Sequence, residues 1–325
     1  MRTLVTGVAG FIGYHCAMAL AARGDDVTGI DNLNAYYDPA LKEARLAALR
    51  HAVPGFRFLK ADIGDRRALG EALSGQAFDI VVHLAAQAGV RSSITSPHIY
   101  ADSNLAGHLN VIEHFRHHDT LRHLVYASSS SVYGANRKLP FSEDDRVDDP
   151  VSLYAATKRA DELMSETYIR LYGMPMTGIR FFTVYGPWGR PDMALWKFVE
   201  AILRDEPITL NNHGRMRRDF TFIDDAIGVL ATIASGPPRN PERQPHVYNI
   251  GNSRSEELKR LVAVIEDALG RKARIVEAPL PLGDVVETHA DLARISADYG
   301  FQPTTAIDVG VPRFVAWYKD HYGIA

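Results

Sequence analysis

A tyrosine and a lysine lie four positions apart in the stretch YAATKRADE, residues 154–162. Residues i and i+4 of a helix share one face, so a helix here places the Tyr154 phenol beside the Lys158 ammonium group. A free phenol is a poor base at neutral pH, but a nearby positive charge favours the phenolate. The pair could therefore take a proton from a hydroxyl group and return it. Because the same spacing arises by chance on many surface helices, the rest of the sequence must decide.

A run of serines stands in the stretch ASSSSVYG, residues 127–134, after an apolar segment that is typical of a strand. Open α/β sheets bind their ligands at the carboxyl ends of parallel strands. A hydroxyl group there could hydrogen-bond a reacting oxygen alongside Tyr154. We predict this role for Ser129, with Ser128 as the second choice. Serines at a strand end also serve as turn residues, and four in a row cannot all be catalytic.

Three spaced glycines, Gly7, Gly10 and Gly13, separate the first apolar segment from a helix expected to begin near Phe11. Such a turn brings backbone amides close to a pyrophosphate at the start of a helix. Asp31 ends the next apolar segment, where a carboxylate can accept hydrogen bonds from ribose hydroxyls and would repel a 2′-phosphate. The pattern predicts NAD rather than NADP, although Asp31 as a turn residue stays an alternative. Asp62 could meet the adenine or could cap a loop.

Short apolar segments alternate with helix-length segments through the first half of the chain. This alternation predicts a parallel sheet with helices on both faces, that is, a doubly wound α/β (Rossmann) fold. After about residue 180 the pattern becomes mixed. We expect a cofactor-binding domain over 1–180, with parts of 215–250 returning to it, and a smaller mixed α/β substrate domain over 181–325. The segments taken as strands are 3–7, 25–31, 56–62, 78–86 and 121–130.

The composition narrows the functional classes. The 325 residues are 46% hydrophobic with a formal net charge of -3 and no basic stripe, so nucleic acid is not an expected partner. No apolar run is long enough to span a membrane, and no signal-peptide pattern opens the chain, so we expect a cytoplasmic protein. The single cysteine, Cys16, lies in an apolar helical segment and is expected to be buried. The histidines of HFRHH, 114–118, lack companion ligands, so no metal site is expected.

The chain resembles the extended short-chain dehydrogenase/reductase family of nucleotide-sugar epimerases and dehydratases. The resemblance rests on the order of the glycine loop, Asp31, the serine run and the Tyr154/Lys158 pair. Further matching stretches are HLAAQAGVR (83–91), NLAGHLNVIE (104–113), RFFTVYGPWGRPDMA (180–194), RDFTFIDD (218–225), YNIGNS (248–253) and FVAWY (314–318). The stretches YYDPALKEARL (36–46) and GPWGRPDMA (186–194) are most like members that act at C4 of UDP-glucuronate.

The resemblance implies a set of roles. Tyr154 would be the base, Lys158 would tune it and hold the nicotinamide ribose, and Ser129 would support the C4 oxygen. Arg218 would contact the diphosphate, with Arg217 as a rival, and Asp284 the uridine ribose. Pro281 stands where the family commonly has glutamine, which puts one polar contact near the nucleotide in doubt. The NAD site would comprise Gly7, Gly10, Phe11, Ile12, Gly13, Asp31, Asn32, Asp62, Ile63, Leu84, Ala85, Ala86, Asn104, Tyr154 and Lys158.

The expected reaction is NAD-dependent epimerisation of UDP-glucuronate to UDP-galacturonate through a transient 4-keto sugar. Family dehydratases and decarboxylases carry an acidic residue just after the strand-end hydroxyl, whereas this chain has Ser130 and Ser131. We expect these serines, Thr183 and Arg190 to hold the C5 carboxylate of the sugar, although Arg190 could be a solvated loop residue. Epimerisation of a neutral UDP-hexose and decarboxylation of UDP-glucuronate remain alternatives.

The segment GHLNVIEHF, 107–115, has helical apolar spacing. In the family, such helices pair across a two-fold axis to form a four-helix bundle. The resemblance therefore implies a homodimer. An apolar helix face buried within the monomer would leave the same pattern in the sequence.

Overall fold

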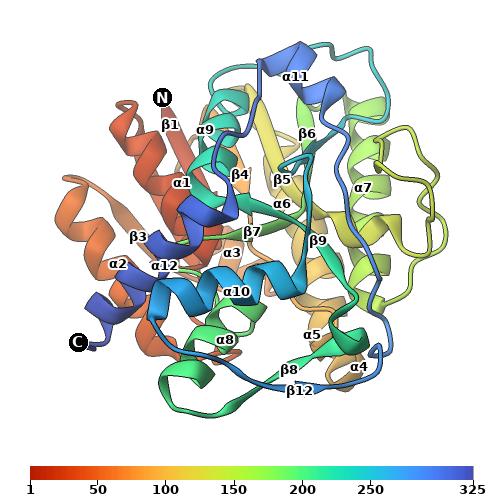
Figure 1. The fold of residues 1–325 in the computed structure, drawn as a ribbon. Helices are drawn as coiled ribbons and strands as arrows, with labels where there is room; N and C mark the ends of the chain where they lie inside the picture. Colours follow the sequence, from red (N-terminus) through yellow and green to blue (C-terminus); the bar gives the residue numbers. More distant parts are fainter. Residues whose placement is uncertain (325) are drawn as a thin grey trace.

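A parallel sheet of seven strands forms the larger part of the molecule, whose computed structural model describes residues 1–324. The strand order is β10-β6-β5-β4-β1-β2-β3, and all neighbouring strands run parallel (Figure 1). Because the order reverses between β1 and β4, a crevice opens beyond their carboxyl ends. The strands are β1 Arg2–Thr6, β2 Asp26–Asp31, β3 Arg57–Lys60, β4 Ile80–His83, β5 His123–Ser129, β6 Met176–Phe181 and β10 Val247–Ile250.

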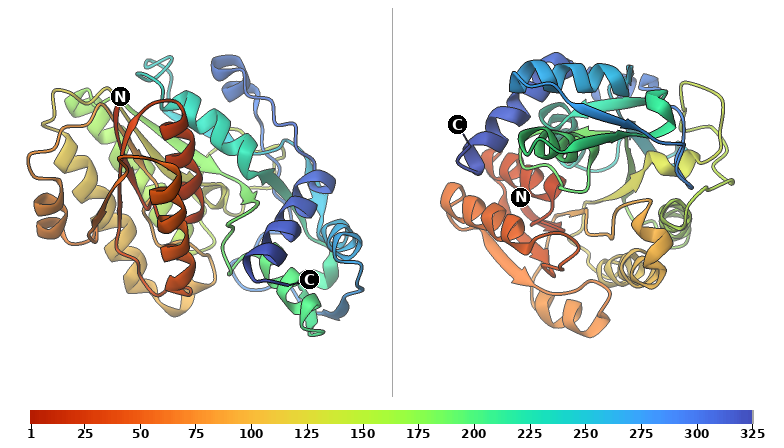
Figure 2. Two further views of the ribbon diagram at one scale, coloured as in Figure 1. Left: turned by 90° about the vertical axis from the view of Figure 1, so that its left-hand side faces the viewer. Right: turned by 60° about the horizontal axis from the view of Figure 1, so that its bottom comes forward.

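Helices cover both faces of this sheet (Figure 2). Alternate strand residues supply two separate apolar cores, with Val5 and Val125 in one and Leu4 and Leu124 in the other. The first core includes side chains of α1 Phe11–Ala22, α2 Pro39–Ala52 and α9 Ile223–Ile233, and the second those of α3 Arg66–Leu73, α6 Gly107–Phe115 and α7 Leu153–Tyr172. The doubly wound fold expected from the sequence is thereby confirmed.

The C-terminal part adds two small sheets and their helices beside the large sheet, coloured green to blue in Figure 2. Strand β9 runs parallel to β7 and antiparallel to β11, while β8 and β12 form a parallel pair. The elements of the C-terminal part are β7 Thr183–Tyr185, α8 Ala194–Leu203, β8 Pro207–Leu210, β9 Arg217–Phe222, β11 Ser255–Glu257, α10 Leu258–Leu269, β12 Arg274–Glu277, α11 Ala293–Tyr299 and α12 Ile307–His321.

Two elements from the second half return to the large sheet. Strand β10 pairs with β6, and α9 packs against α1. We therefore propose that the cofactor-binding unit comprises 1–180 together with α9 and β10, and that the remainder of 181–325 forms the substrate unit.

The region between α6 and β4 is built from short helical turns. They are α4 Ser92–Thr95, α5 Pro97–Tyr100 and the wider π-helical turn Ala101–Ala106, which continues directly into α6. Two 3₁₀ turns, Ser130–Tyr133 and Asn211–Gly214, complete the secondary structure. The first of them follows β5, so it carries the serine run away from the strand end.

Local chemistry explains where the central helix α7 begins and ends. The Ser152 hydroxyl accepts a hydrogen bond from the Ala155 amide at 3.1 Å, which satisfies a free donor of the first turn. Gly173 ends the helix in the left-handed region at φ 65°, where a glycine adds no steric cost. The helix predicted to carry Tyr154 and Lys158 on one face is therefore present.

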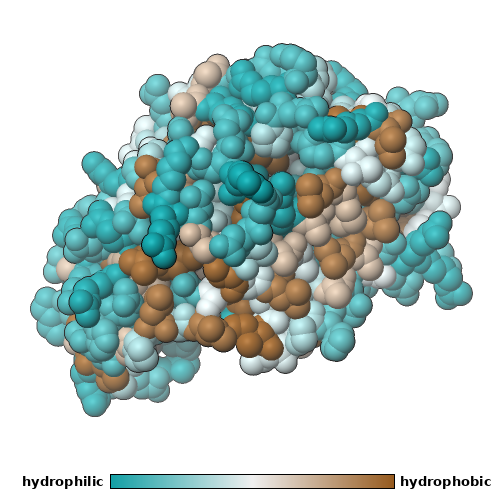
Figure 3. All heavy atoms as spheres, turned by 90° about the vertical axis from the view of Figure 1, so that its right-hand side faces the viewer, coloured by the Kyte–Doolittle hydropathy of each residue, from teal (hydrophilic) through white to brown (hydrophobic). Residues whose placement is uncertain are grey.

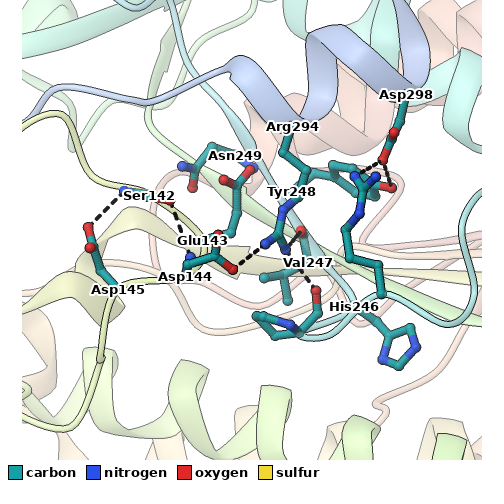
Figure 4. Close-up of polar contacts among 12 residues, drawn as sticks. Ser142, Glu143, Asp144, Asp145, His246, Val247, Tyr248, Asn249, Arg294 and Asp298 are labelled. Atoms are coloured by element: carbon teal, nitrogen blue, oxygen red, sulfur yellow. Dashed lines mark hydrogen bonds and ion pairs between the residues drawn. The ribbon is translucent and has the colours of Figure 1, made fainter.

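A polar network ties the loop after β5 to β10 and α11 (Figure 4). The Asn249 amide donates to Glu143 at 2.8 Å, and the Tyr248 hydroxyl donates to Asp298 at 2.7 Å. Arg294 donates to Asp144 and to the carbonyl oxygen of Pro245. These bonds fix the long connection that leads into α7, and so they fix the start of the helix that bears Tyr154.

Cys16 is fully buried, as expected, and burial raises the pKa of its thiol to about 12. Among residues 1–324, no helix combines the length and the apolar character needed to cross a membrane.

Candidate active site

A cavity of about 930 Å³ lies between the carboxyl ends of the large sheet and the C-terminal part. Its wall includes nearly every site residue predicted from the sequence. These are Gly7, Gly10, Phe11, Ile12, Gly13, Asp31, Asn32, Asp62, Ile63, Leu84, Ala85, Ala86, Ser128, Ser129, Ser130, Ser131, Tyr154, Lys158, Thr183, Arg190, Arg218 and Asp284. Residues spread over most of the chain thus meet around one space large enough for an extended ligand.

The glycine loop fits the pyrophosphate of a dinucleotide. Gly7 has φ 71°, which L side chains rarely adopt, and a Cβ atom there would lie 2.8 Å from the Ala85 amide nitrogen. A Cβ atom on Gly13 would lie 2.1 Å from the Gly7 carbonyl oxygen, so only glycine permits this tight turn. The loop leads directly into α1, whose free amide groups and dipole favour an anion at its N-terminus.

Asp31 and Asp62 line the part of the wall where the adenosine would lie. Asp31 accepts hydrogen bonds from the amides of Ala9 at 3.1 Å and Leu33 at 2.8 Å. Burial raises the pKa of its carboxyl group, although the two amide bonds and Lys42 oppose this effect. Asp62 accepts hydrogen bonds from Asn32 and from the Gly64 amide, both at 2.8 Å. Both carboxylates are held by the backbone, and each keeps lone pairs for a ligand.

Asn104 is the one predicted cofactor residue that does not reach the cavity wall. Its side chain is buried behind the wall, where it bonds the backbone of Gln87 at 2.8 and 3.1 Å and the Thr157 hydroxyl at 3.0 Å. A direct contact of Asn104 with the cofactor therefore stays a prediction. Asn104 joins the loop after β4 to α7, because an amide can both donate to and accept from the backbone.

Helix α7 brings Tyr154 and Lys158 to the cavity. The Tyr154 ring packs edge to face against Tyr100, with 6.1 Å between the ring centroids. Lys158 is buried and donates a hydrogen bond of 2.7 Å to the Asp161 carboxylate. Burial raises the pKa of Asp161 to about 6, and Lys158 partly opposes this. The sequence analysis missed Asp161, although its i+3 position relative to Lys158 is a spacing that favours contact on a helix.

The two serine candidates point in different directions. Ser128 donates a hydrogen bond of 2.6 Å to Glu162 inside the core. The Ser129 hydroxyl accepts one from the Ser131 amide at 3.1 Å and lies 3.2 Å from the Ser131 hydroxyl. Because the Ser128 hydroxyl is committed to a buried carboxylate, Ser129 remains the better candidate for contact with a substrate.

Arg190 lines the cavity and forms a bidentate ion pair with Asp192. The Nε–Oδ1 and Nη2–Oδ2 distances are 2.9 and 2.8 Å. Burial alone would lower the pKa of Arg190, but Asp192, with Tyr154 and Tyr36 further contributing, raises it above its ordinary value. Arg190 is therefore a permanent cation within electrostatic reach of Tyr154. The sequence analysis did not find Asp192 or Tyr36, although both lie in the stretches that carried the resemblance.

Asp284 links two other arginines. Arg218 donates to Asp284 at 2.7 Å, and Arg91 forms a second ion pair with the same carboxylate at 3.5 Å. Arg91 also lines the cavity and was missed, although it ends the matching stretch 83–91. Arg217 points elsewhere and pairs with Glu257 and Glu287 at 3.0 and 3.3 Å. Of the two rivals for a diphosphate contact, only Arg218 faces the cavity.

The fold and the cavity together define a Rossmann-type protein with a glycine loop suited to a dinucleotide. The sequence profile of the NAD dependent epimerase/dehydratase family matches residues 3–251. The chain belongs to this family, and it is accordingly an NAD-dependent nucleotide-sugar epimerase.

Three comparisons extend this result. The chain is 50% identical, over 100% of both chains, to an uncharacterized 37.6 kDa protein of Escherichia coli O111:H-. It is 45% identical to a probable UDP-glucuronate 4-epimerase of Rhizobium meliloti, covering 99% of this chain and 98% of the relative. The crystal structure of UDP-glucuronic acid 4-epimerase from Bacillus cereus with UDP-glucuronic acid and NAD is 30% identical, with a TM-score of 0.89 and 99% and 100% coverage.

Proposed function

We propose that the protein interconverts UDP-glucuronate and UDP-galacturonate by inverting C4 of the sugar. The observation that carries the proposal is Arg190, a cation on the cavity wall within electrostatic reach of Tyr154. A sugar whose C4 hydroxyl meets Tyr154 has its C5 substituent nearby. An arginine matches a carboxylate there, because its planar fork donates two parallel hydrogen bonds.

The roles of the side chains follow from their positions. When bound, NAD supplies the site that accepts a hydride from C4 and gives it back. Tyr154 takes the proton of the C4 hydroxyl and returns it, and Ser129 hydrogen-bonds the C4 oxygen. Lys158 is held by Asp161 and lines the same cavity as Tyr154, where it would hold the nicotinamide ribose.

The same arrangement disfavours loss of carbon dioxide or water. The residues that follow Ser129 in the 3₁₀ turn carry hydroxyls, Ser130 and Ser131, so this turn offers no carboxylate to move further protons. With Thr183 and Arg190, these serines would hold the C5 carboxylate of the sugar and keep it out of line with the π system of the 4-keto intermediate.

An assay of product identity tests the proposal. The purified protein is incubated with UDP-glucuronate without added reductant, and the products are separated by chromatography and identified by NMR. We expect UDP-galacturonate, and much slower turnover of UDP-glucose. A UDP-pentose with carbon dioxide would show a decarboxylase, and equal turnover of UDP-glucose would show a neutral-hexose epimerase.

Tyr154→Phe tests the acid–base assignment. Removing the hydroxyl should lower kcat by roughly 100- to 10,000-fold while the protein still retains NAD. Tyr172→Phe, on the far end of the same helix, is the matched control and should leave turnover unchanged. Unaltered turnover in Tyr154→Phe would refute the mechanism.

We further propose that the protein forms a homodimer through α6 and α7. Figure 3 shows apolar side chains gathered on the α7 side of the molecule. The exposed apolar residues of this region are Ile94, Ile99, Leu109, Leu163 and Leu171. Two helices from each of two copies would bury this surface as a four-helix bundle. Light scattering should give twice the chain mass for the wild type and the single chain mass for Leu163→Glu. Val309→Glu, on the exposed face of α12 away from α7, is the control.

A further inference from the structure

The segment between β2 and the middle of α2, residues 34–45, lies against the loop that carries Arg190. This loop, residues 186–193, adopts an uncommon backbone conformation, since Trp188 has φ 63°. A non-glycine residue with left-handed backbone angles is strained. It persists only where its surroundings hold it, which happens often at functional sites. The contacts that hold Trp188 therefore bear on where Arg190 points.

Arg45 supplies the main backbone contact. It is fully buried on α2, and its Nη2 atom donates to the carbonyl oxygens of Trp188 at 2.7 Å and Gly189 at 2.9 Å. Its Nη1 atom donates to the Ala9 carbonyl of the glycine loop at 2.9 Å and to the Tyr37 hydroxyl at 2.7 Å. One guanidinium group thus joins the cofactor loop to the residues directly before Arg190.

Tyr36 acts on the other side of the same loop. Its hydroxyl donates to Asp192 Oδ2 at 3.3 Å and lies 2.9 Å from the Ser92 hydroxyl. Asp192 in turn holds two nitrogen atoms of Arg190. A guanidinium group has five N–H donors. The Nε atom and Nη2 of Arg190 bond Asp192, and Nη2 also donates to the Met193 sulfur at 3.7 Å, so the two Nη1 hydrogens are left for a ligand.

We propose that Tyr36 and Arg45 are positioning residues that set the selectivity of the site for an anionic sugar by holding Arg190 in place. The inference rests on the proposed function, because Arg190 must recognise the substrate carboxylate. Residues 34–45 would then contribute to substrate selectivity, in addition to any part in binding the cofactor. Through Arg45, this segment would hold Arg190 at a fixed position relative to the glycine loop.

The test measures the ratio of kcat/KM for UDP-glucuronate to kcat/KM for UDP-glucose. Arg45→Lys keeps the positive charge, but an ammonium group cannot bond all four oxygen atoms that Arg45 contacts. The variant should lower the ratio by roughly tenfold, as expected when hydrogen bonds to a charged group are weakened. Tyr36→Phe removes one hydroxyl without a change of charge and should lower the ratio a few-fold. Arg50→Lys, exposed on the same helix, and Tyr172→Phe are the matched controls and should keep the wild-type ratio.

The Arg190→Met background separates positioning from a general structural effect. There, Arg45→Lys and Tyr36→Phe should change the ratio no further, because they act through Arg190. A wild-type ratio in folded Arg45→Lys or Tyr36→Phe, or an equal fall in the Arg190→Met background, would overturn the inference. If Arg45→Lys does not fold, Tyr36→Phe decides alone. A wild-type protein that does not prefer UDP-glucuronate would overturn the proposed function as well.

Discussion

Two arginine–carboxylate pairs in this molecule have nearly the same geometry and different surroundings. We call Arg180 with Glu162 the core pair and Arg190 with Asp192 the cavity pair. Both are bidentate, with N–O distances of 2.8 and 2.9 Å in each. The side chains of the core pair are each 1% exposed, while those of the cavity pair are 26% and 24% exposed. The difference teaches that burial, not pair geometry, separates a structural ion pair from one available to a ligand.

The remaining donors of the core arginine are also used inside the protein. Arg180 donates to the Tyr133 hydroxyl at 3.1 Å, and that hydroxyl donates to Asn249 at 2.7 Å. Burial alone would raise the pKa of Glu162, but Arg180 outweighs it and holds the pKa below its ordinary value. Since Ser128 donates to the same carboxylate, the core pair locks the carboxyl end of β5 against α7.

Breaking the core pair should have the largest effect on stability. Arg180→Met leaves the buried Glu162 without its main partner, which costs about 3–5 kcal/mol of unfolding free energy. Denaturant unfolding of the variant and the wild type measures this loss. Arg159→Met is the control, because Arg159 pairs with the same carboxylate at 3.0 Å from the surface and should cost at most about 1 kcal/mol. Equal losses of unfolding free energy for the two variants would show that burial of Arg180 adds nothing to its pairing with Glu162.

Breaking the cavity pair should affect substrate selection instead. Arg190→Met should change the unfolding free energy by no more than about 1 kcal/mol. It should lower kcat/KM for UDP-glucuronate by roughly 10- to 100-fold, the loss expected for hydrogen bonds to a charged group. Turnover of UDP-glucose should stay unchanged. Steady-state kinetics with both substrates would contradict the account if the two rates fell together.

Acidification should lower the stability of the fold without changing the substrate selectivity of the cavity. Burial lowers the pKa of His123 on β5 to about 4, so this side chain is neutral in the folded protein but takes up a proton on unfolding below about pH 6.5. The unfolding free energy should therefore fall as pH decreases from 6.5 to 4. The cavity pair stays ionised over this range, because Arg190 holds the pKa of Asp192 below its ordinary value despite burial.

Unfolding curves and substrate selectivity, each measured at several pH values, test this expectation. The unfolding free energy should fall between pH 6.5 and pH 5, while the ratio of kcat/KM for the two UDP-sugars stays constant among folded molecules. A stability that rises with acidification, or a selectivity that falls with it, would be inconsistent with the two environments.

The adjacent serines give the finest comparison. Ser128→Ala removes the hydroxyl bond to the core pair and should lower the unfolding free energy by about 1–2 kcal/mol with little change in turnover. Ser129→Ala should do the reverse and lower kcat by roughly 100- to 1,000-fold, since it removes one hydrogen bond to the reacting oxygen. Thermal unfolding and kinetics of both variants measure the contrast. Equal effects of the two substitutions on turnover would mean that either hydroxyl can serve.

Local patterns in the sequence were sufficient for five of the seven strands of the large sheet and for α7, but they did not mark β6 or β10 as strands. The glycine turn, Asp31 at the end of β2 and the Tyr154/Lys158 pair are each defined by residues close together in the chain. The functions of Arg45 and Glu162 could not be predicted in this way. Arg45 contacts Trp188 and Gly189 from more than 140 positions away, and only folding brings them together.

Asn104 shows a different limit of the sequence. The family resemblance implied a cofactor contact for this residue, but its amide bonds the loop after β4 and the Thr157 hydroxyl of α7. A buried amide that satisfies Gln87 and Thr157 removes the cost of leaving those groups unpaired.

The central claim is that hydrogen leaves C4 of an anionic sugar and returns to the same carbon while Tyr154 holds the proton. UDP-glucuronate labelled with deuterium at C4, incubated with the protein in ordinary water, tests this claim most directly. We predict UDP-galacturonate that keeps the deuterium at C4, as read by NMR and mass spectrometry. UDP-galacturonate with the label lost to water, or a UDP-pentose with carbon dioxide, would contradict it.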